Sequence, residues 1–194
     1  GVLFAFLEEN GLMDNTMIVF TADHGDYLGD HWMGEKDLFH EAVIKAPLII
    51  YDPDPRADAT RGTRSQALVE AVDIAPTFLD VYGGPAVPHI MDGRSLRPLL
   101  FGQQPADWRT EVVCEYDFSF QESRIALGAK PRDAWMRMVR DGRWKYVLFE
   151  NYRPMLFDLQ QDPNEFKDLG ASTAPEHVAA MQRLHEALFR WARQ

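Results

Sequence analysis

Two short runs early in the chain constrain the fold most, because they are apolar at almost every position. They are residues 17–21 (MIVFT) and residues 47–51 (PLIIY). Asp-Asn-Thr precedes the first run and Asp-Pro-Asp-Pro follows the second, so turn-forming residues bound both. Strands without polar alternation are typical of parallel sheets that helices cover on both faces. We therefore predict an α/β fold in which both runs belong to a mostly parallel sheet.

Helix signals surround these two strands. An amphipathic pattern at the start of the chain ends before Gly11, and glycine commonly follows a helix C-terminus. Asp73 is in position to cap a second helix, and Pro76 fits its first turn, where a missing N–H costs little. The predicted elements of this half are helices at residues 2–9, 74–81 and 95–101, and a further strand at residues 66–72.

The pattern changes at about residue 111, where shorter stretches separated by turns begin. Asp141-Gly142 predicts a tight hairpin between two of these stretches. We expect strands at residues 111–116, 135–140, 144–149 and 156–159, an irregular stretch at 118–132, and a closing helix at 175–193. Residues 1–105 would then form part of an α/β domain, and residues 106–194 a small antiparallel sheet with one terminal helix.

Composition excludes some classes of function. The net charge is −10, from 30 acidic and 20 basic residues, so a broad basic surface for nucleic acid is not expected. No apolar run approaches the roughly 18–20 residues of a membrane span, so no membrane partner is expected either. The single cysteine, Cys114, cannot form an internal disulfide, which is compatible with a reducing compartment such as the cytoplasm. We expect Cys114 to be a small core residue, and the chain to be part of a longer protein.

Residues 20–41 concentrate the titratable chemistry, with three histidines and six acidic residues. Asp23 and His24 follow the end of a predicted strand, where open parallel sheets bind their ligands. A carboxylate and an imidazole at that point can coordinate one divalent cation. Lys36 lies in the same loop and could place an ammonium beside an anionic group that the metal holds. The alternatives are a polar turn at the strand end and a solvated surface lysine.

Several motifs follow one another in order along most of the chain. They are Asp23-His24-Gly25 with Leu28-Gly29-Asp30-His31, Gly34 and Lys36; Ala46-Pro47-Leu48-Ile49-Ile50; Val72-Asp73-Ile74-Ala75-Pro76-Thr77; Asp92-Gly93-Arg94-Ser95-Leu96; Val139-Arg140-Asp141-Gly142-Arg143-Trp144-Lys145-Tyr146; and Leu156-Phe157-Asp158-Leu159 with Asp162-Pro163. Together they resemble the carboxyl-terminal portion of the sulfatase family. That family belongs to the alkaline-phosphatase superfamily and includes arylsulfatases and phosphonate monoester hydrolases.

The resemblance implies roles for three residues. Asp23 and His24 would be ligands of a single active-site divalent metal, and Lys36 would contact the sulfate or phosphonate group. Many sulfatases carry Asn in place of His24, and the His form occurs in phosphonate monoester hydrolases. Ca²⁺, Mn²⁺ or Mg²⁺ would fit such a site, and the imidazole makes Zn²⁺ plausible as well. The family's nucleophile is a formylglycine made from a Cys/Ser-x-Pro/Ala-x-Arg motif, which we expect upstream of this chain.

Cys114 does not fit that motif, because Glu115, Tyr116 and Asp117 follow it. We therefore expect no nucleophile in this chain and no turnover by the chain alone. The intact protein is expected to hydrolyse a small anionic ester, a sulfuric ester in the first instance. The alternatives are a phosphonate monoester or phosphodiester, or a metal-binding remnant without catalysis. Family members occur as monomers, dimers and tetramers, so a homo-oligomer is compatible with the resemblance.

The remaining polar residues have simpler interpretations. Asp26 and Asp30 could orient the metal loop from a second shell or act as loop caps. His31 could line the pocket, and a structural role is favoured. His40 is expected to pack rather than catalyse. Surface or helix-face positions are expected for His89, His177 and His185, and a solvated strand face for Arg140, Arg143 and Lys145.

Overall fold

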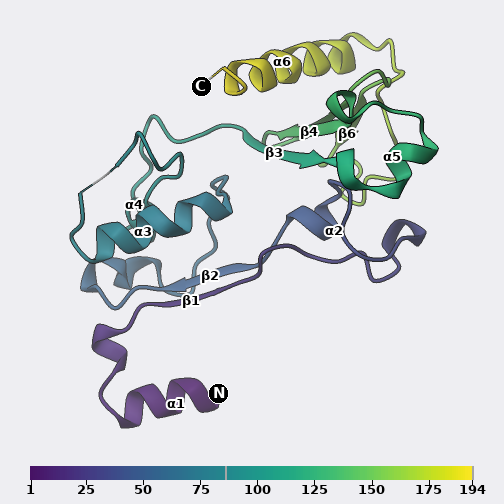
Figure 1. Cartoon of the computed structure of the whole chain (residues 1–194). Coiled ribbons are helices and arrows are strands. Elements are labelled where there is room, and N and C mark those ends of the chain that lie inside the picture. Colours follow the sequence, from purple (N-terminus) through teal and green to yellow (C-terminus); the bar gives the residue numbers. More distant parts are fainter. Residues whose placement is uncertain (86, 194) are drawn as a thin grey trace. The chain divides into compact units, whose positions relative to one another are not determined.

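The computed structural model describes residues 1–85 and 87–193 of the chain (Figure 1). Its contacts divide the chain into two compact units, and each unit is built from two separate stretches of the chain. The first unit comprises Gly1–Asp23 and Ala46–Trp108, and the second comprises His24–Lys45 and Arg109–Gln194. The predicted mixture of helices and sheets, with a small antiparallel sheet and a terminal helix, is confirmed. The proposed domain boundary at residue 105 stays a prediction.

Both apolar runs of the first unit are strands, β1 (Ile18–Thr21) and β2 (Leu48–Tyr51). They pair antiparallel, from Ile18 opposite Tyr51 to Thr21 opposite Leu48. The predicted parallel part of the sheet is therefore not seen among residues 1–85 and 87–193. Uniformly apolar strands are typical of parallel sheets, but the direction of any one pair depends on the path of the chain between the two strands.

The helices of the first unit are α1 (Val2–Glu9), α3 (Ile74–Val81) and α4 (Arg97–Leu100). All three helix predictions are confirmed, although α4 is shorter than expected. The strand predicted at residues 66–72 is wrong, because residues 66–70 have no regular structure and a 3-10 turn follows at Ala71–Asp73. One physical reason is that the indole Nε1–H of Trp108 donates to the carbonyl of Leu68, at 2.9 Å, in place of a neighbouring strand.

Asp73 connects two of the sequence motifs, residues 72–77 and residues 92–96. Its buried carboxylate accepts hydrogen bonds from the N–H groups of Glu70 and Arg94, both at 2.8 Å. A Cβ on Gly93 would lie 2.0 Å from the carbonyl oxygen of Val72, so only glycine permits this approach. The two motifs therefore form one structural unit at the start of α3. The prediction that the Asp73 side chain caps this helix is wrong, because its carboxylate binds Glu70 and Arg94 instead.

The second unit contains a four-stranded antiparallel sheet in the order β3-β4-β5-β6. Its strands are β3 (Val112–Asp117), β4 (Trp135–Arg140), β5 (Trp144–Phe149) and β6 (Met155–Asp158). The predicted hairpin at Asp141-Gly142 joins β4 and β5, and the N–H of Asp141 donates to the carbonyl of Trp144 at 3.0 Å. The stretch predicted to be irregular contains a short helix, α5 (Glu122–Ala126).

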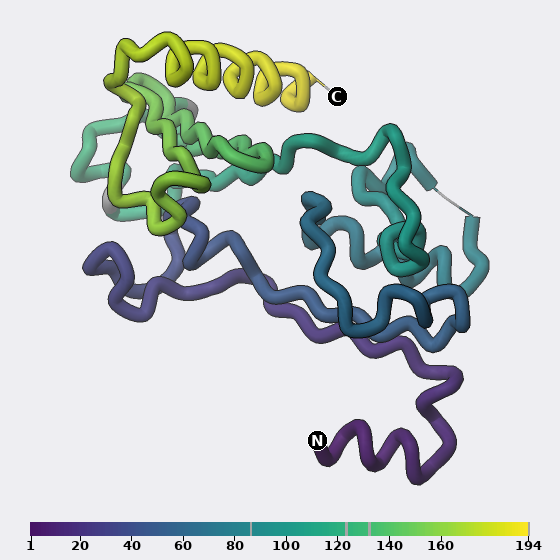
Figure 2. Tube along the Cα trace, turned by 180° about the vertical axis from the view of Figure 1, so that it is seen from behind, coloured from purple at the N-terminus to yellow at the C-terminus, as the bar shows by residue number. Residues whose placement is uncertain are grey.

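Apolar side chains fill both faces of this sheet. One cluster joins the sheet to α6 (Pro175–Trp191), the predicted closing helix. It consists of Val139, Trp144, Tyr146, Leu156, Ala180, Leu184, Ala187 and Leu188. Figure 2 shows α6 in yellow along the green strands. The other cluster contains Met136, Met138, Val147, Phe157 and Phe39, and Cys114 packs against it.

Phe39 belongs to the segment His24–Lys45, which also contains α2 (Glu41–Ile44). This segment is therefore packed on the sheet face opposite α6, and it contains most of the predicted site residues.

None of the helices in the described residues is long and apolar enough to cross a membrane.

Candidate active site

The loop of residues 24–36 is closed at its base by close backbone contacts. The N–H of Gly25 donates to the carbonyl of Val43 at 2.6 Å, and the N–H of Tyr27 donates to the carbonyl of Glu35 at 3.0 Å. A Cβ on Gly25 would lie 2.0 Å from the carbonyl oxygen of Ala42. Position 25 therefore needs a residue without a side chain, which accounts for the glycine of the Asp-His-Gly motif.

His24 and Lys36 are in direct contact. His24 Nε2 lies 2.5 Å from the Lys36 ammonium, and its Nδ1 lies 2.6 Å from the carbonyl oxygen of Gly25. A carbonyl only accepts, so Nδ1 must carry the proton and Nε2 the lone pair. Lys36 therefore donates to the nitrogen that would bind a metal. A hydrogen bond from the other ring nitrogen to a backbone carbonyl is the usual way to orient a metal-binding histidine.

Asp23 ends the segment of the first unit, and His24 begins that of the second, so only their covalent link is described. The Asp23 side chain is exposed. In the described part of the chain, no three residues of the His, Cys, Asp and Glu types are grouped so that they could hold a metal. A carboxylate and an oriented imidazole nevertheless fit a partial ligand set for a divalent cation. The role of Asp23 and His24 as metal ligands stays a prediction.

Two of the three residues predicted for a second shell or the pocket, Asp26 and His31, form local contacts. The carboxylate of Asp26 accepts the N–H of Leu28 at 2.9 Å, which caps a turn. Asp30 is exposed and begins a 3-10 turn, Asp30–Trp32. The His31 ring stacks on the His40 ring, with centroids 4.0 Å apart and planes 22° apart. Asp26 thus caps a turn and His31 packs against a ring, whereas Asp30 forms no side-chain cap of its turn. The second-shell and pocket roles of the three residues stay predictions.

His40 is the centre of an aromatic cluster that the sequence did not reveal. The hydroxyl of Tyr27, which is 1% exposed, forms a 2.6 Å hydrogen bond with His40 Nδ1. Burial lowers the pKa of His40 to about 4, and the positive charges of His31 and Lys145 act in the same direction. Burial raises the pKa of Tyr27 to about 12. Both side chains are therefore neutral near pH 7 and act as packing groups.

Lys145 corrects the prediction of a solvated strand face. Its side chain is 0% exposed, and its ammonium lies 2.9 Å from Glu41 and 2.7 Å from Glu165. Arg140 also pairs with Glu41, at 3.2 Å. One signal could have indicated this burial, because Lys145 lies on the same face of β5 as Val147, two residues away. Its acidic partners are too distant in the sequence to be predicted.

The other positions are structural. Arg143 is also paired rather than merely solvated, because its guanidinium lies 2.7 Å from Asp158 and 2.6 Å from Glu176. The hydrogen bond with Arg143 lowers the pKa of Asp158. His89 is exposed as predicted. His177 and His185 lie on α6, where their Nδ1 atoms contact Ser172 Oγ at 2.7 Å and the Tyr146 hydroxyl at 3.0 Å.

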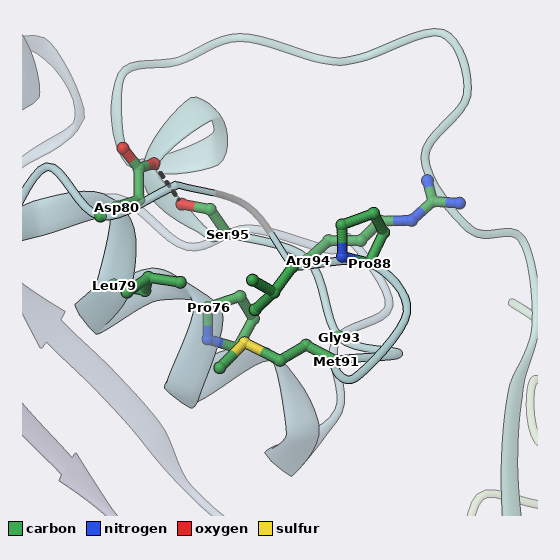
Figure 3. Close-up of a pocket in the computed structure, with 10 residues that line it drawn as sticks. Pro76, Leu79, Asp80, Pro88, Met91, Gly93, Arg94 and Ser95 are labelled. Carbon is green, nitrogen blue, oxygen red and sulfur yellow. Dashed lines mark hydrogen bonds between the residues drawn. The ribbon is translucent and has the colours of Figure 1, made fainter.

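The first unit contains a pocket of about 180 Å³ (Figure 3). Its lining includes Pro76, Leu79 and Met91, together with the polar residues Asp80 and Ser95. The Ser95 hydroxyl donates to the Asp80 carboxylate at 2.6 Å, so these two polar groups satisfy one another. Arg94 also lines the pocket, and its guanidinium donates to the carbonyl of Asp107. The pocket includes none of the predicted site residues.

Comparison with known proteins agrees with the sequence motifs. The family described as N-sulphoglucosamine sulphohydrolase, C-terminal, matches residues 29–194. The multifunctional alkaline phosphatase superfamily protein PehA of Trinickia caryophylli is 34% identical over 194 residues, covering 98% of this chain and 37% of that protein. An N-acetylglucosamine-6-O-sulfatase of Bacteroides thetaiotaomicron is also 34% identical over 194 residues, covering 96% of this chain and 32% of that protein.

Solved structures include the phosphonate monoester hydrolase of Agrobacterium radiobacter, which superposes with a TM-score of 0.87 at 32% identity. That match covers 100% of this chain and 38% of the hydrolase. The chain therefore spans well under half the length of each of these relatives. The match over residues 29–194 shows that the chain belongs to the sulfatase family of the alkaline-phosphatase superfamily and corresponds to a C-terminal region of that family.

Proposed function

We propose that the intact protein hydrolyses small anionic esters, and that this chain supplies part of its active site. The reaction adds water to a sulfuric ester and releases an alcohol and sulfate. The observation that supports the proposal most is the 2.5 Å contact between Lys36 and the lone-pair nitrogen of His24. An ammonium beside an oriented imidazole provides a cationic site at the loop, in a chain whose net charge is −10.

The three predicted residues would divide the work. Asp23 and His24 would hold one divalent metal ion, with further ligands supplied from outside this chain. When bound, such a metal would act as a Lewis acid toward a sulfuryl or phosphoryl oxygen. Lys36 would stabilise the negative charge that develops on the same group during hydrolysis. For His24 to bind a metal through Nε2, Lys36 must move from that nitrogen to the substrate.

The nucleophile is proposed to be a formylglycine in another part of the protein. Cys114 packs within the sheet of the second unit and lies outside any Cys-x-Pro/Ala-x-Arg motif. We therefore expect residues 1–194 alone to hydrolyse no ester, and the tests below need the full-length protein.

The first test replaces Lys36 by Met in the full-length protein. Removal of one cationic group that stabilises transition-state charge is expected to lower kcat by about 10²–10³-fold. Lys45→Met is the matched control, because Lys45 is exposed and ends the same segment. Asp23→Asn and His24→Ala should reduce the metal content measured by mass spectrometry. Unchanged metal content in both variants would contradict the ligand assignment.

Phosphonate monoester hydrolysis is the second candidate, and one observation favours it. The phosphonate monoester hydrolase superposes on this chain with a TM-score of 0.87 over the whole of it. Phosphonate monoesters, phosphodiesters and sulfate monoesters share a single negative charge at neutral pH, so one site could accept all three. Rates with 4-nitrophenyl esters of sulfate, phenylphosphonate and ethyl phosphate would rank the candidates. A full-length protein that binds metal but hydrolyses none of the three would favour a binding module.

A further inference from the structure

A buried ion cluster joins the loop segment to the sheet of the second unit. Its centre is Lys145 of β5, whose side chain is 0% exposed. The ammonium donates to the carbonyl of Phe39 at 2.8 Å and lies within 2.9 Å of carboxylate oxygens of Glu41 and Glu165. One hydrogen bond and two ion pairs thus surround the ammonium, and buried charges persist where opposite charges pair with them.

The cluster is balanced in charge and reaches α2 from three sides. Arg140 of β4 pairs with Glu41 at 3.2 Å, so two cations face two carboxylates. The second oxygen of Glu165 accepts the backbone N–H of Glu41 at 2.6 Å. Glu165 itself has a φ of 57°, a left-handed conformation that is uncommon outside glycine. The first residue of α2 is thus held by β4, β5 and the turn at residue 165.

Residues 37–44, which include Phe39 and α2, adjoin both ends of the loop that contains His24 and Lys36. At one end, the carbonyl of Val43 in α2 accepts the N–H of Gly25, the neighbour of His24. At the other end, Asp37 begins the segment and is the chain neighbour of Lys36, and its carboxylate accepts a 3.3 Å hydrogen bond from the Tyr116 hydroxyl of β3. A displacement of residues 37–44 would therefore move both His24 and Lys36.

Stability alone does not account for such a cluster. Replacing buried ion pairs with apolar residues of similar volume is often neutral or stabilising. An apolar residue at position 145 could still pack beside Val147, but it could not donate to the carbonyl of Phe39. What Lys145 adds is a fixed direction and register for the segment that leads to Lys36.

We propose that Lys145 is a positioning residue for the ester-hydrolysing site, acting through Phe39 and Glu41 to fix His24 and Lys36. This inference rests on the proposed function for its catalytic consequence. Its structural part, the fixing of the loop of residues 24–36, is independent of the reaction.

The test uses the full-length protein and a charge-balanced double variant, Lys145→Met with Glu165→Gln. Glu41 and Arg140 remain as a pair in that variant, so no buried charge is left without a partner. Lys145→Met alone leaves an excess carboxylate and is expected to lower the melting temperature. Lys167→Met is the matched control, because Lys167 is an exposed lysine two residues from Glu165.

Two readouts are needed. Hydrogen exchange at the amides of Gly25 and Tyr27 reports the loop directly, and we expect it to become about tenfold faster in the double variant. Steady-state kinetics report the site, and we expect kcat to fall by about 10–100-fold while KM changes by less than about threefold. A merely structural role would restore kcat together with the melting temperature in the double variant.

Each outcome has one meaning. Wild-type exchange rates at both amides in the double variant would overturn the proposal. Faster exchange with wild-type kcat would overturn it as well, because the loop would then be displaced without consequence. If the unmodified full-length protein hydrolyses none of the three esters, the proposed function fails. Faster exchange in the double variant would then still support Lys145 as the residue that fixes the loop.

Discussion

The two units of the chain are stabilised in different ways. Among the described residues, 16 of the 19 buried apolar side chains belong to the second unit, and only Leu7, Ala57 and Leu96 belong to the first. Among the same described residues, each unit buries three polar or charged side chains, so these weigh more in the first unit; they are Asp52, Asp73 and Thr77 in the first unit and Lys145, Asp158 and Glu165 in the second. Apolar burial is non-directional, whereas buried polar groups depend on particular partners. We therefore expect the second unit to lose stability through cavities and the first through loss of single partners.

The largest effect is expected from Leu184→Ala in the second unit. Leu184 is 0% exposed in the cluster between α6 and the sheet. Its truncation should lower the free energy of unfolding by about 3–4 kcal/mol, the sum of lost transfer energy and a cavity. Chemical denaturation measures the free energy of unfolding, and hydrogen exchange of the α6 amides shows where stability is lost. Tyr82→Ala in the first unit is the control, because Tyr82 is 87% exposed. Equal losses in the two variants would remove the contrast between the units.

The next effect is expected from Arg97→Met in the first unit. The Arg97 guanidinium lies 3.3 Å from Asp52, whose side chain is 2% exposed. The substitution leaves that carboxylate buried without its cation, which should cost about 3 kcal/mol. Hydrogen exchange of α3 and α4 should report the loss, and α6 should not change. Arg56→Met should have a smaller effect, because Arg56 is 64% exposed.

Gly25→Ala should sharpen the comparison by separating the loop segment from the core of its own unit. The new methyl group would meet the carbonyl oxygen of Ala42, and the backbone must shift, at a cost of about 2 kcal/mol. Hydrogen exchange of the amide of residue 25, which donates to Val43, should accelerate more than the exchange of amides in β4 and β5. Gly34→Ala is the control, since a Cβ there has no neighbour within 4 Å. Identical exchange in both variants would argue against a tightly closed loop base.

The smallest effect concerns pH. Burial lowers the pKa of folded His40 to about 4 from an ordinary value of 6.5, so the unfolded chain binds more protons between these values. Stability should therefore fall as the pH falls from about 6.5 to about 4, by about 1 kcal/mol once partial exposure is considered. His40→Gln should reduce this dependence. Glu165 is present in both proteins, so its raised pKa does not affect the difference. A steeper dependence in the variant would contradict the assignment to His40.

The sequence predicted those elements whose signals are local. The turn-bounded stretches of β4 and β5, the Asp141-Gly142 turn and the helical spacing of α6 each involve residues close together in the chain. The direction of β1 against β2 was not predictable, because two uniformly apolar strands fit either direction. The false strand at residues 66–72 failed for a related reason. The partner of the Leu68 carbonyl is Trp108, 40 residues away.

The same distinction applies to the candidate site. The motif spacing brought His24 and Lys36 to attention, and the structure places them in contact across 12 residues of sequence. Lys145 was misinterpreted because its partner Phe39 is 106 residues away. No local pattern announces a lysine that is buried beneath a distant segment. Its position beside Val147 on one strand face was the only available signal in the strand itself.

The second unit is built from two stretches that lie far apart in the chain, and this has a consequence for synthesis on the ribosome. The backbone N–H of Glu41 finds its partner, Glu165, 124 residues later in the chain. At about 5–20 residues per second, the loop segment waits roughly 6–25 s before its docking surface has been translated. For most of that interval Phe39 lacks the side chains of β4, β5 and β6 that pack against it. Slow codons between residues 45 and 165 would therefore lengthen the exposure of the segment that bears Lys36.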